Sequence, residues 1–118
     1  MSKRPVDLLL EDIREAVERV QGYAAGMSED AFLKDQRTSD AVVRNLEIIG
    51  EAASRLPSDF KQRHAQIEWE KIVGLRHRIV HDYFGIDLRI VWKILQSDLP
   101  GLSAKLKTLG SKLPEASS

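Results

Sequence analysis

The chain contains no cysteine, which excludes disulfide bonds, thiolate nucleophiles and cysteine-ligated zinc or iron-sulfur sites. Glycine-rich phosphate loops, dinucleotide-binding glycine patterns and a nucleophile elbow are also absent. No apolar run approaches the roughly 20 residues that span a bilayer, and no apolar stretch behind a basic N-terminus resembles a signal peptide. These absences predict a cytoplasmic protein with no membrane partner.

The chain has no net charge either, because 18 basic residues balance 18 acidic ones. Overall charge therefore gives no support for nucleic-acid binding, which would need a local patch such as Arg76, Arg78 and Arg89. In other respects the composition is ordinary: of 118 residues, 42% are hydrophobic and 31% are charged. This length and composition predict a single globular domain, which we place at residues 1–110, followed by a flexible tail at 111–118.

Helical periodicity dominates the first half of the chain, with apolar residues at helical spacing and charged residues on the opposite faces. The starts are indicated by short polar residues that accept backbone N–H groups, and the ends by glycine or proline. The predicted helices run from Pro5 to Ala25, from a Ser28 cap to Lys34, and from a cap at Thr38 or Ser39 to Pro57. The third helix has an apolar stripe of Val42, Leu46, Ile49, Ala53 and Leu56.

The second half continues the helical pattern with more interruptions. The predicted elements are a short helical turn within 58–67, a helix from Trp69 to Phe84 that Gly85 ends, and a helix that Asp87 caps. The last helix continues past Pro100, which kinks it or restarts it behind an Asp98 cap. No segment shows the alternation of a half-buried strand. The sequence therefore predicts an all-α fold, an antiparallel bundle of four to five helices.

One predicted helix carries an arginine within its apolar pattern. If residues 69–84 are helical, one stripe contains Trp69, Ile72, Val73, Ile79, Val80 and Tyr83, and Arg76 lies near its centre. An arginine cannot lose its charge, and an unpaired charge in a low-dielectric interior costs several kcal/mol. The stripe must therefore open at this level onto a partner, an anion or a cleft.

The side chains beside Arg76 do not all point the same way on an ideal helix. His81 lies about 140° from Arg76, whereas Tyr83 lies within about 20° of it. Either the helix frays near His81, or two copies of the chain each supply part of a shared pocket. Gly74 lies on the same flank as His81 and would let a second backbone approach closely. We interpret this pattern as an indication of a two-fold dimer.

We consider three roles for these residues: a metal site, metal-free catalysis and a purely structural role. His77 and His81 are four positions apart, but two ligands do not make a metal site, and Arg78 replaces the acid that a zinc-protease helix places beside its first histidine. A metal-free alternative is cleavage of a phosphodiester, in which a histidine moves the proton of a ribose 2′-hydroxyl and Arg76 stabilises charge on the phosphate. In a structural alternative, Arg76 makes an ion pair, His81 caps a helix end and Tyr83 fills the core.

A resemblance to a known family favours the second chemistry. Arg76, His81 and Tyr83 form an Arg-x4-His-x-Tyr motif. Three phrases accompany it in order: NLEIIGEAA at 45–53, GLRHRIVHDYFGID at 74–87 and IVWKILQSDLP at 90–100. Over nearly the whole chain, these features resemble HEPN-domain toxins of the HepT-like family.

The resemblance implies a HEPN-like bundle that forms a two-fold dimer, with an RNA-binding cleft between the copies. The implied activity is that of a metal-independent endoribonuclease, which needs no cofactor. It implies Arg76 and His81 as the catalytic pair and His77 as an accessory contact, at a position that is often Asn or Asp in the family. The implied partner is a nucleotidyltransferase antitoxin of a type II toxin-antitoxin system, in a dimer or a larger hetero-oligomer. That partner inactivates the toxin by transferring AMP to Tyr83.

Two other functions stay open on the sequence. One is a non-catalytic module that holds a nucleotide or a partner in the cleft. The other is a scaffold that dimerises and docks the nucleotidyltransferase. Neither requires His81 to move a proton.

Overall fold

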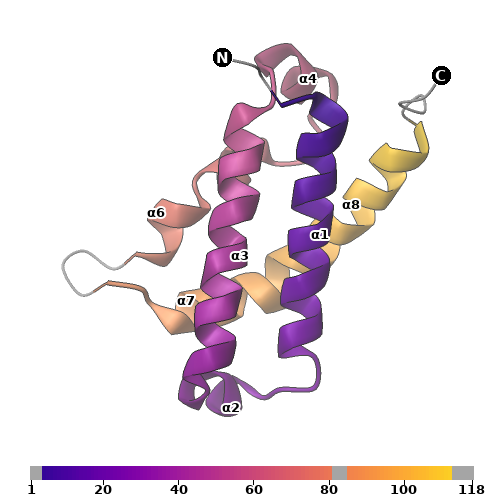
Figure 1. Cartoon of the computed structure of the whole chain (residues 1–118). Helices are drawn as coiled ribbons and strands as arrows, with labels where there is room; N and C mark the ends of the chain where they lie inside the picture. The colour runs from indigo at the N-terminus through magenta and orange to yellow at the C-terminus, as the bar shows by residue number, and fades with distance from the viewer. Residues whose placement is uncertain (1–3, 81–84, 113–118) are drawn as a thin grey trace.

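Two long antiparallel helices form the centre of the molecule. A computed structural model of the chain describes residues 4–80 and 85–112. In it α1 (Val6–Ala24) packs along α3 (Gln36–Arg55), and the short α2 (Glu29–Lys34) lies in their connection (Figure 1). Both long helices are amphipathic and bury their apolar faces, so these two predicted helices are confirmed.

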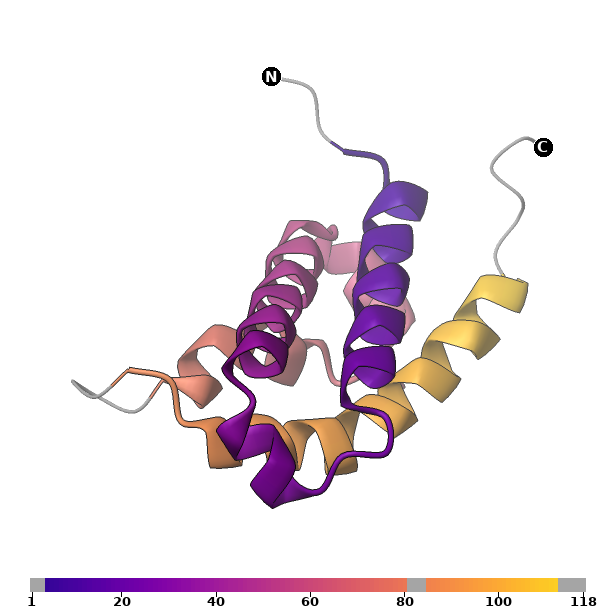
Figure 2. The ribbon, with the colours of Figure 1, turned by 60° about the horizontal axis from the view of Figure 1, so that its bottom comes forward.

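A third and longer rod crosses the α1–α3 pair. It consists of α7 (Leu88–Lys93), the π-helical segment η2 (Ile94–Asp98) and α8 (Leu99–Lys112), which follow one another without a loop (Figure 1 and Figure 2). At its two ends the rod contacts α2 through α7 and α1 through α8. Three short helices link α3 to the rod: α4 (Ser58–Arg63), α5 (Trp69–Val73) and α6 (Leu75–Ile79).

The predicted all-α class is confirmed over the described ranges. Their one β feature is an isolated antiparallel bridge between Val80 and Ile86. The core draws on every layer, and its largest fully buried side chains are Ile13, Val17, Val20, Phe32, Val42, Leu46, Ile49, Ile67, Ile79, Ile94, Leu99 and Leu109. None of the described helices has the length and apolar character needed to cross a membrane.

Side-chain caps confirm two of the predicted helix starts and correct a third. The side chains of Ser28 and Asp87 accept backbone N–H groups at the starts of α2 and α7, as predicted. The prediction that Thr38 or Ser39 caps α3 is wrong, because the Asp35 carboxylate accepts the N–H of Thr38 at 3.0 Å. This hydrogen bond favours the charged carboxylate and lowers the pKa of Asp35.

The predicted continuous helix from Trp69 to Phe84 is wrong. Gly74 separates α5 from α6, and Val80 has an extended backbone with φ −92° and ψ 130°. The helical pattern therefore ends at Ile79, well before the predicted stop at Gly85. Residues 81–84 of the predicted helix lie outside the described residues.

The rod contains a π-helical turn where the sequence predicted a kink or a restart. In η2 the N–H of Leu99 donates to the carbonyl of Ile94, five residues earlier. Pro100 has no N–H, and in a regular helix its ring would crowd the carbonyl four residues before it. The wider turn admits the ring while the helix continues. Asp98, the cap of the restart alternative, instead pairs with Arg78 on α6.

The segment α5–α6 comes very close to α3 at Gly50. A Cβ added at Gly50 would lie 3.2 Å from the carbonyl oxygen of Ile72 and 3.6 Å from that of Val73. The sequence suggested that Gly74 lets the backbone of a second copy approach, which stays a prediction; within the single chain, a Cβ added there would meet the carbonyl of Glu70 in its own turn, at 3.1 Å. Among the glycines whose surroundings the structure describes, Gly50 is thus the one that lets two helical segments meet.

Substitutions at Gly50 test this contact. In a helix, alanine is normally more stable than glycine by roughly 0.5–1 kcal/mol. We expect Gly50→Ala to lose that gain because its methyl group presses on the Ile72 carbonyl, and we expect Gly50→Val to lower the free energy of unfolding by roughly 1–3 kcal/mol. Gly22 on α1 is a matched control, since no atom lies within 4 Å of its added Cβ. Urea unfolding that shows the same gain for Gly50→Ala and Gly22→Ala would contradict the close approach.

Candidate functional site

The helix α6 presents three basic side chains around a narrow buried ridge. Leu75 and Ile79 form the ridge and are 3% and 0% exposed. At about 100° per residue, Arg76 and Arg78 lie on opposite flanks of this ridge, and His77 lies on the outer face. Arg76 and His77 are exposed, whereas Arg78 is partly buried. The two arginines therefore do not form one continuous patch.

Arg76 is an exposed residue, and the prediction that it lies at the centre of a buried stripe is wrong. That stripe counted Val73 and Val80 as core residues, but they are 36% and 40% exposed. It also left out Leu75, which is buried. Among the residues that the structure describes, no carboxylate forms an ion pair with Arg76. The charge is thus unpaired there but hydrated.

Arg76 and His77 line an open groove between α6 and one face of α3, which we call the α3–α6 groove. Its volume is about 420 Å³, and it extends to the beginning of α1. The face of α3 that lines it is the charged face opposite the apolar stripe. Besides Arg76 and His77, the charged residues of the groove are Arg4, Asp12, Arg44, Glu47, Glu51 and Arg55.

Ion pairs neutralise some of these charges and leave others open. The pairs are Arg4–Asp12 at 2.7 Å and Arg55–Glu51 at 3.1 Å. The hydrogen bond to Asp12 also raises the pKa of Arg4. Over residues 4–80 and 85–109, Arg44, Arg76 and Glu47 form no ion pair. The groove therefore offers two open guanidinium groups against one open carboxylate.

Sequence reasoning missed Arg44 as a candidate binding residue. An arginine on the outer face of an amphipathic helix is ordinary, so the pattern assigned it to solvent. No signal in the sequence distinguishes it from the other charged residues of α3. Its relevance comes from the tertiary packing that sets α6 beside that face.

The chain beyond α6 turns back on itself. The N–H of Asp87 donates to the carbonyl of Ile79 at 2.7 Å, next to the Val80–Ile86 bridge. Gly85 supports the return with a φ of 83°, a conformation that favours glycine.

Two of the predicted site residues, His81 and Tyr83, lie outside the described residues. Because α6 ends at Ile79, the expectation that Tyr83 shares a helix face with Arg76 no longer has a basis. Its argument required an uninterrupted helix from Arg76 through Tyr83.

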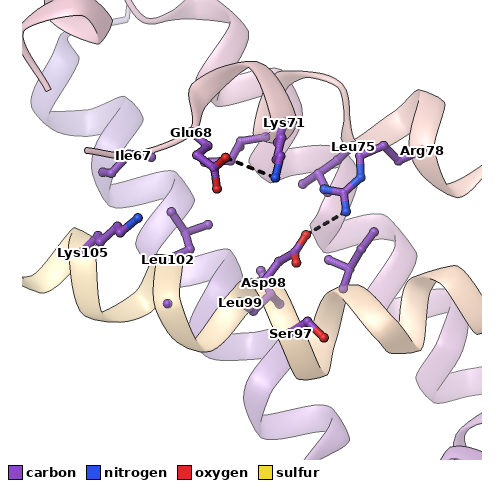
Figure 3. A pocket seen from close by; sticks show the side chains of 13 residues that line it. Ile67, Glu68, Lys71, Leu75, Arg78, Ser97, Asp98, Leu99, Leu102 and Lys105 are labelled. Carbon is purple, nitrogen blue, oxygen red and sulfur yellow. Dashed lines mark hydrogen bonds and ion pairs between the residues drawn. The ribbon is translucent and has the colours of Figure 1, made fainter. Parts of the chain in front are cut away.

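The other flank of α6 faces the rod. There Arg78 donates to the carboxylate of Asp98 at 2.8 Å, beside a cavity of about 230 Å³ (Figure 3). Lys71 and Glu68 form a second ion pair at the same cavity, at 3.1 Å. Within the described part of the chain, no three His, Asp or Glu side chains lie close enough to hold a metal ion.

The fold and this site define a class of small all-α proteins in which a short basic helix lies beside an open groove. In this chain the helix is α6, and the Val80–Ile86 bridge follows it. A family model described as "Ribonuclease HepT-like" matches residues 13–109. The chain therefore belongs to the ribonuclease HepT-like family, and the resemblance expected from the motif is confirmed.

Proteins with similar sequences come from archaea and bacteria. A protein of Thermococcus cleftensis named "Probable ribonuclease HepT" is 42% identical over 100 residues, which cover 85% of this chain and 91% of that protein. A provisionally named RNase of Caldanaerobacter subterraneus is 36% identical over 104 residues, covering 88% and 89%. Another, from Methanocaldococcus jannaschii, is 40% identical over 100 residues, covering 85% and 83%. No solved structure matches the chain significantly.

Proposed function

We propose that this chain is a metal-independent endoribonuclease and the toxin of a type II toxin-antitoxin system. Arg76 and His81 form its catalytic pair, and His77 is an accessory contact to RNA. Membership of the ribonuclease HepT-like family and the names of the relatives support the ribonuclease activity. The observation that carries the proposal is the exposed guanidinium of Arg76 in the α3–α6 groove, without an ion pair among the described residues.

The reaction needs little from the protein because RNA contains its own nucleophile. The ribose 2′-oxygen attacks the adjacent phosphorus, and the bond from phosphorus to the 5′-oxygen breaks. His81 removes the 2′-hydroxyl proton or protonates the leaving 5′-oxygen, a role that histidine fills more often than any other residue in general acid–base catalysis. Arg76 stabilises the charge that develops on the phosphate oxygens. The products are a 2′,3′-cyclic phosphate and a 5′-hydroxyl.

A second copy of the chain completes the cleft in this proposal. Three of the five exposed large apolar side chains in the described ranges are close to Arg76 in the sequence: Val73, Val80 and Ile86, at 36%, 40% and 41% exposure. Exposed apolar groups beside a polar site are typical of protein interfaces. They support a two-fold interface that brings the motifs of both copies to one cleft.

Tyr83 is the proposed site of inactivation by the partner nucleotidyltransferase. The tyrosine hydroxyl attacks the α-phosphorus of ATP, pyrophosphate leaves and AMP stays on the phenolic oxygen. The new phosphate carries a negative charge that an open guanidinium such as Arg76 can bind. Inactivation then follows because the modification blocks the cleft and occupies the arginine that would bind the RNA phosphate.

Cleavage of RNA in the presence of EDTA tests the proposed reaction. We expect the unmodified wild-type chain to cleave, and His81→Ala to be slower by about 10²–10⁴-fold, because the proton transfers lose their carrier. His64→Ala is a matched control, since His64 packs against Phe60 at a tilt of 48°, outside the groove, and its loss should leave the rate unchanged. Equal cleavage by wild type and His81→Ala contradicts the proposal, and RNA binding without cleavage in every form favours a non-catalytic binding module.

The role of Arg76 in holding phosphate predicts a change in salt dependence. In the inactive His81→Ala background, Arg76→Ala should weaken binding to single-stranded RNA and reduce the slope of log K against log salt by about 0.7 for each phosphate that the variant no longer neutralises. The control is Arg63→Ala on α4, since Arg63 is exposed and lies outside the groove. If both variants keep the wild-type slope, Arg76 does not contact phosphate.

The mass of the intact chain tests the proposed modification. After coexpression with a nucleotidyltransferase encoded beside this chain, we expect the mass to increase by one or more AMP units and Tyr83→Phe to keep the unmodified mass. Tyr23→Phe serves as the control, because Tyr23 is exposed on α1 and should not prevent the gain. An unmodified wild-type chain that is still neutralised by its partner would show that inhibition works by occlusion alone.

A further inference from the structure

α6 is too short to fix its own orientation. It has five residues, and no side chain caps its start at Gly74. A helix of so few residues is not stable by itself in water, so neighbouring elements must hold it. Leu75 and Ile79 anchor one edge in the core. These two side chains lie along a single line, so they do not prevent α6 from rotating about that line. A further contact is needed to fix its rotation.

The ion pair between Arg78 and Asp98 supplies that restraint. The guanidinium Nη2 lies 2.8 Å from the Asp98 Oδ2, and Figure 3 shows Arg78 reaching from α6 to the rod. Over the described ranges, it is the one ion pair that joins α6 to another helix. Both side chains are more than a third exposed, so the pair contributes little to overall stability. The pair does restrict how α6 can rotate.

The π-helical turn explains why a carboxylate is available at this position. A π turn holds one more residue than an α turn, so it shifts the residues after it by about 100° around the helix. η2 ends at Asp98, and Pro100 follows two positions later. The proline therefore favours the wide turn, and Asp98, the last residue of that turn, pairs with Arg78 on α6.

We infer that Arg78 and Asp98 are positioning residues whose ion pair fixes the rotation of α6 and thereby directs Arg76 into the α3–α6 groove. Arg76 and Arg78 are two positions apart, about 200° around the helix. Any rotation that releases Arg78 from Asp98 moves Arg76 relative to α3. The kinetic consequence rests on the proposed ribonuclease function, whereas the restraint on α6 does not.

Asp98→Asn separates positioning from binding. It keeps the shape of the side chain, removes its charge and leaves Arg78 as an additional open cation. We expect kcat for RNA cleavage to fall by about two- to fivefold, because loss of an exposed ion pair misplaces Arg76 for part of the time. We expect KM to stay the same or to fall, because the released arginine attracts phosphate. Loss of an RNA contact by Asp98 would raise KM instead. The amount of folded protein is measured by circular dichroism and kcat is expressed per folded chain, so that partial unfolding does not give the same result.

Two further variants provide controls. Asp30→Asn on α2 makes the same change in net charge, but its partner is Lys34 in its own helix, so kcat should not change. The double variant Arg78→Asp with Asp98→Arg reverses the ion pair. It should recover most of the kcat that Arg78→Asp alone loses, and this recovery would not occur if Arg78 acted only by binding phosphate.

Amide hydrogen exchange measures how firmly α6 is held, and it does not require the protein to be active. The hydrogen-bonded amides of α6, those of Arg78 and Ile79, should exchange about two- to fivefold faster in Asp98→Asn than in wild type, whereas those of α1 should not change. If wild type cleaves RNA and Asp98→Asn matches it in kcat and in exchange, the inference is wrong and the proposed function stands. If no form cleaves RNA, the proposed function is wrong and the exchange rates alone decide the restraint.

Discussion

The position of α6 depends on one close packing contact, the approach of the α5–α6 segment to α3 at Gly50. A side chain there would press on the carbonyl of Ile72. Because Gly50 has none, Leu75 and Ile79 reach the core while their helix remains beside α3. The same packing leaves Arg76 on the surface next to the charged face of α3. The groove is thus a consequence of how α6 is seated.

The long helices and several caps could be predicted because their signals are local. Ser28 and Asp87 each stand directly before an amphipathic run, and a short polar side chain there has few other partners. The start of α3 was harder because Asp35, Thr38 and Ser39 are all good caps within a short stretch. The charged carboxylate is favoured at a helix N-terminus, and it precedes the other two.

Helical periodicity failed to predict burial where the burial of a residue depends on distant parts of the chain. Val73 and Val80 fit an apolar stripe, but neither the break at Gly74 nor the return at Val80 is visible in a helical period. Arg76 was singled out because the pattern placed it in a buried stripe, and that placement is wrong. The expected problem was a buried charge. The structure instead presents a hydrated charge without an ion pair among its described neighbours, which costs little to keep and is open to an anion.

A neutral chain with a local cationic groove suits short-range recognition of a polyanion. With no net charge, the protein has no strong field to attract RNA from a distance, so affinity depends on contacts made after encounter. Those contacts depend on the direction of a few side chains, and α6 is held by two buried residues and one ion pair. On the proposed function, a single added phosphate can therefore inactivate the site. It competes for the open guanidinium groups of the groove, of which the described residues supply two, Arg44 and Arg76.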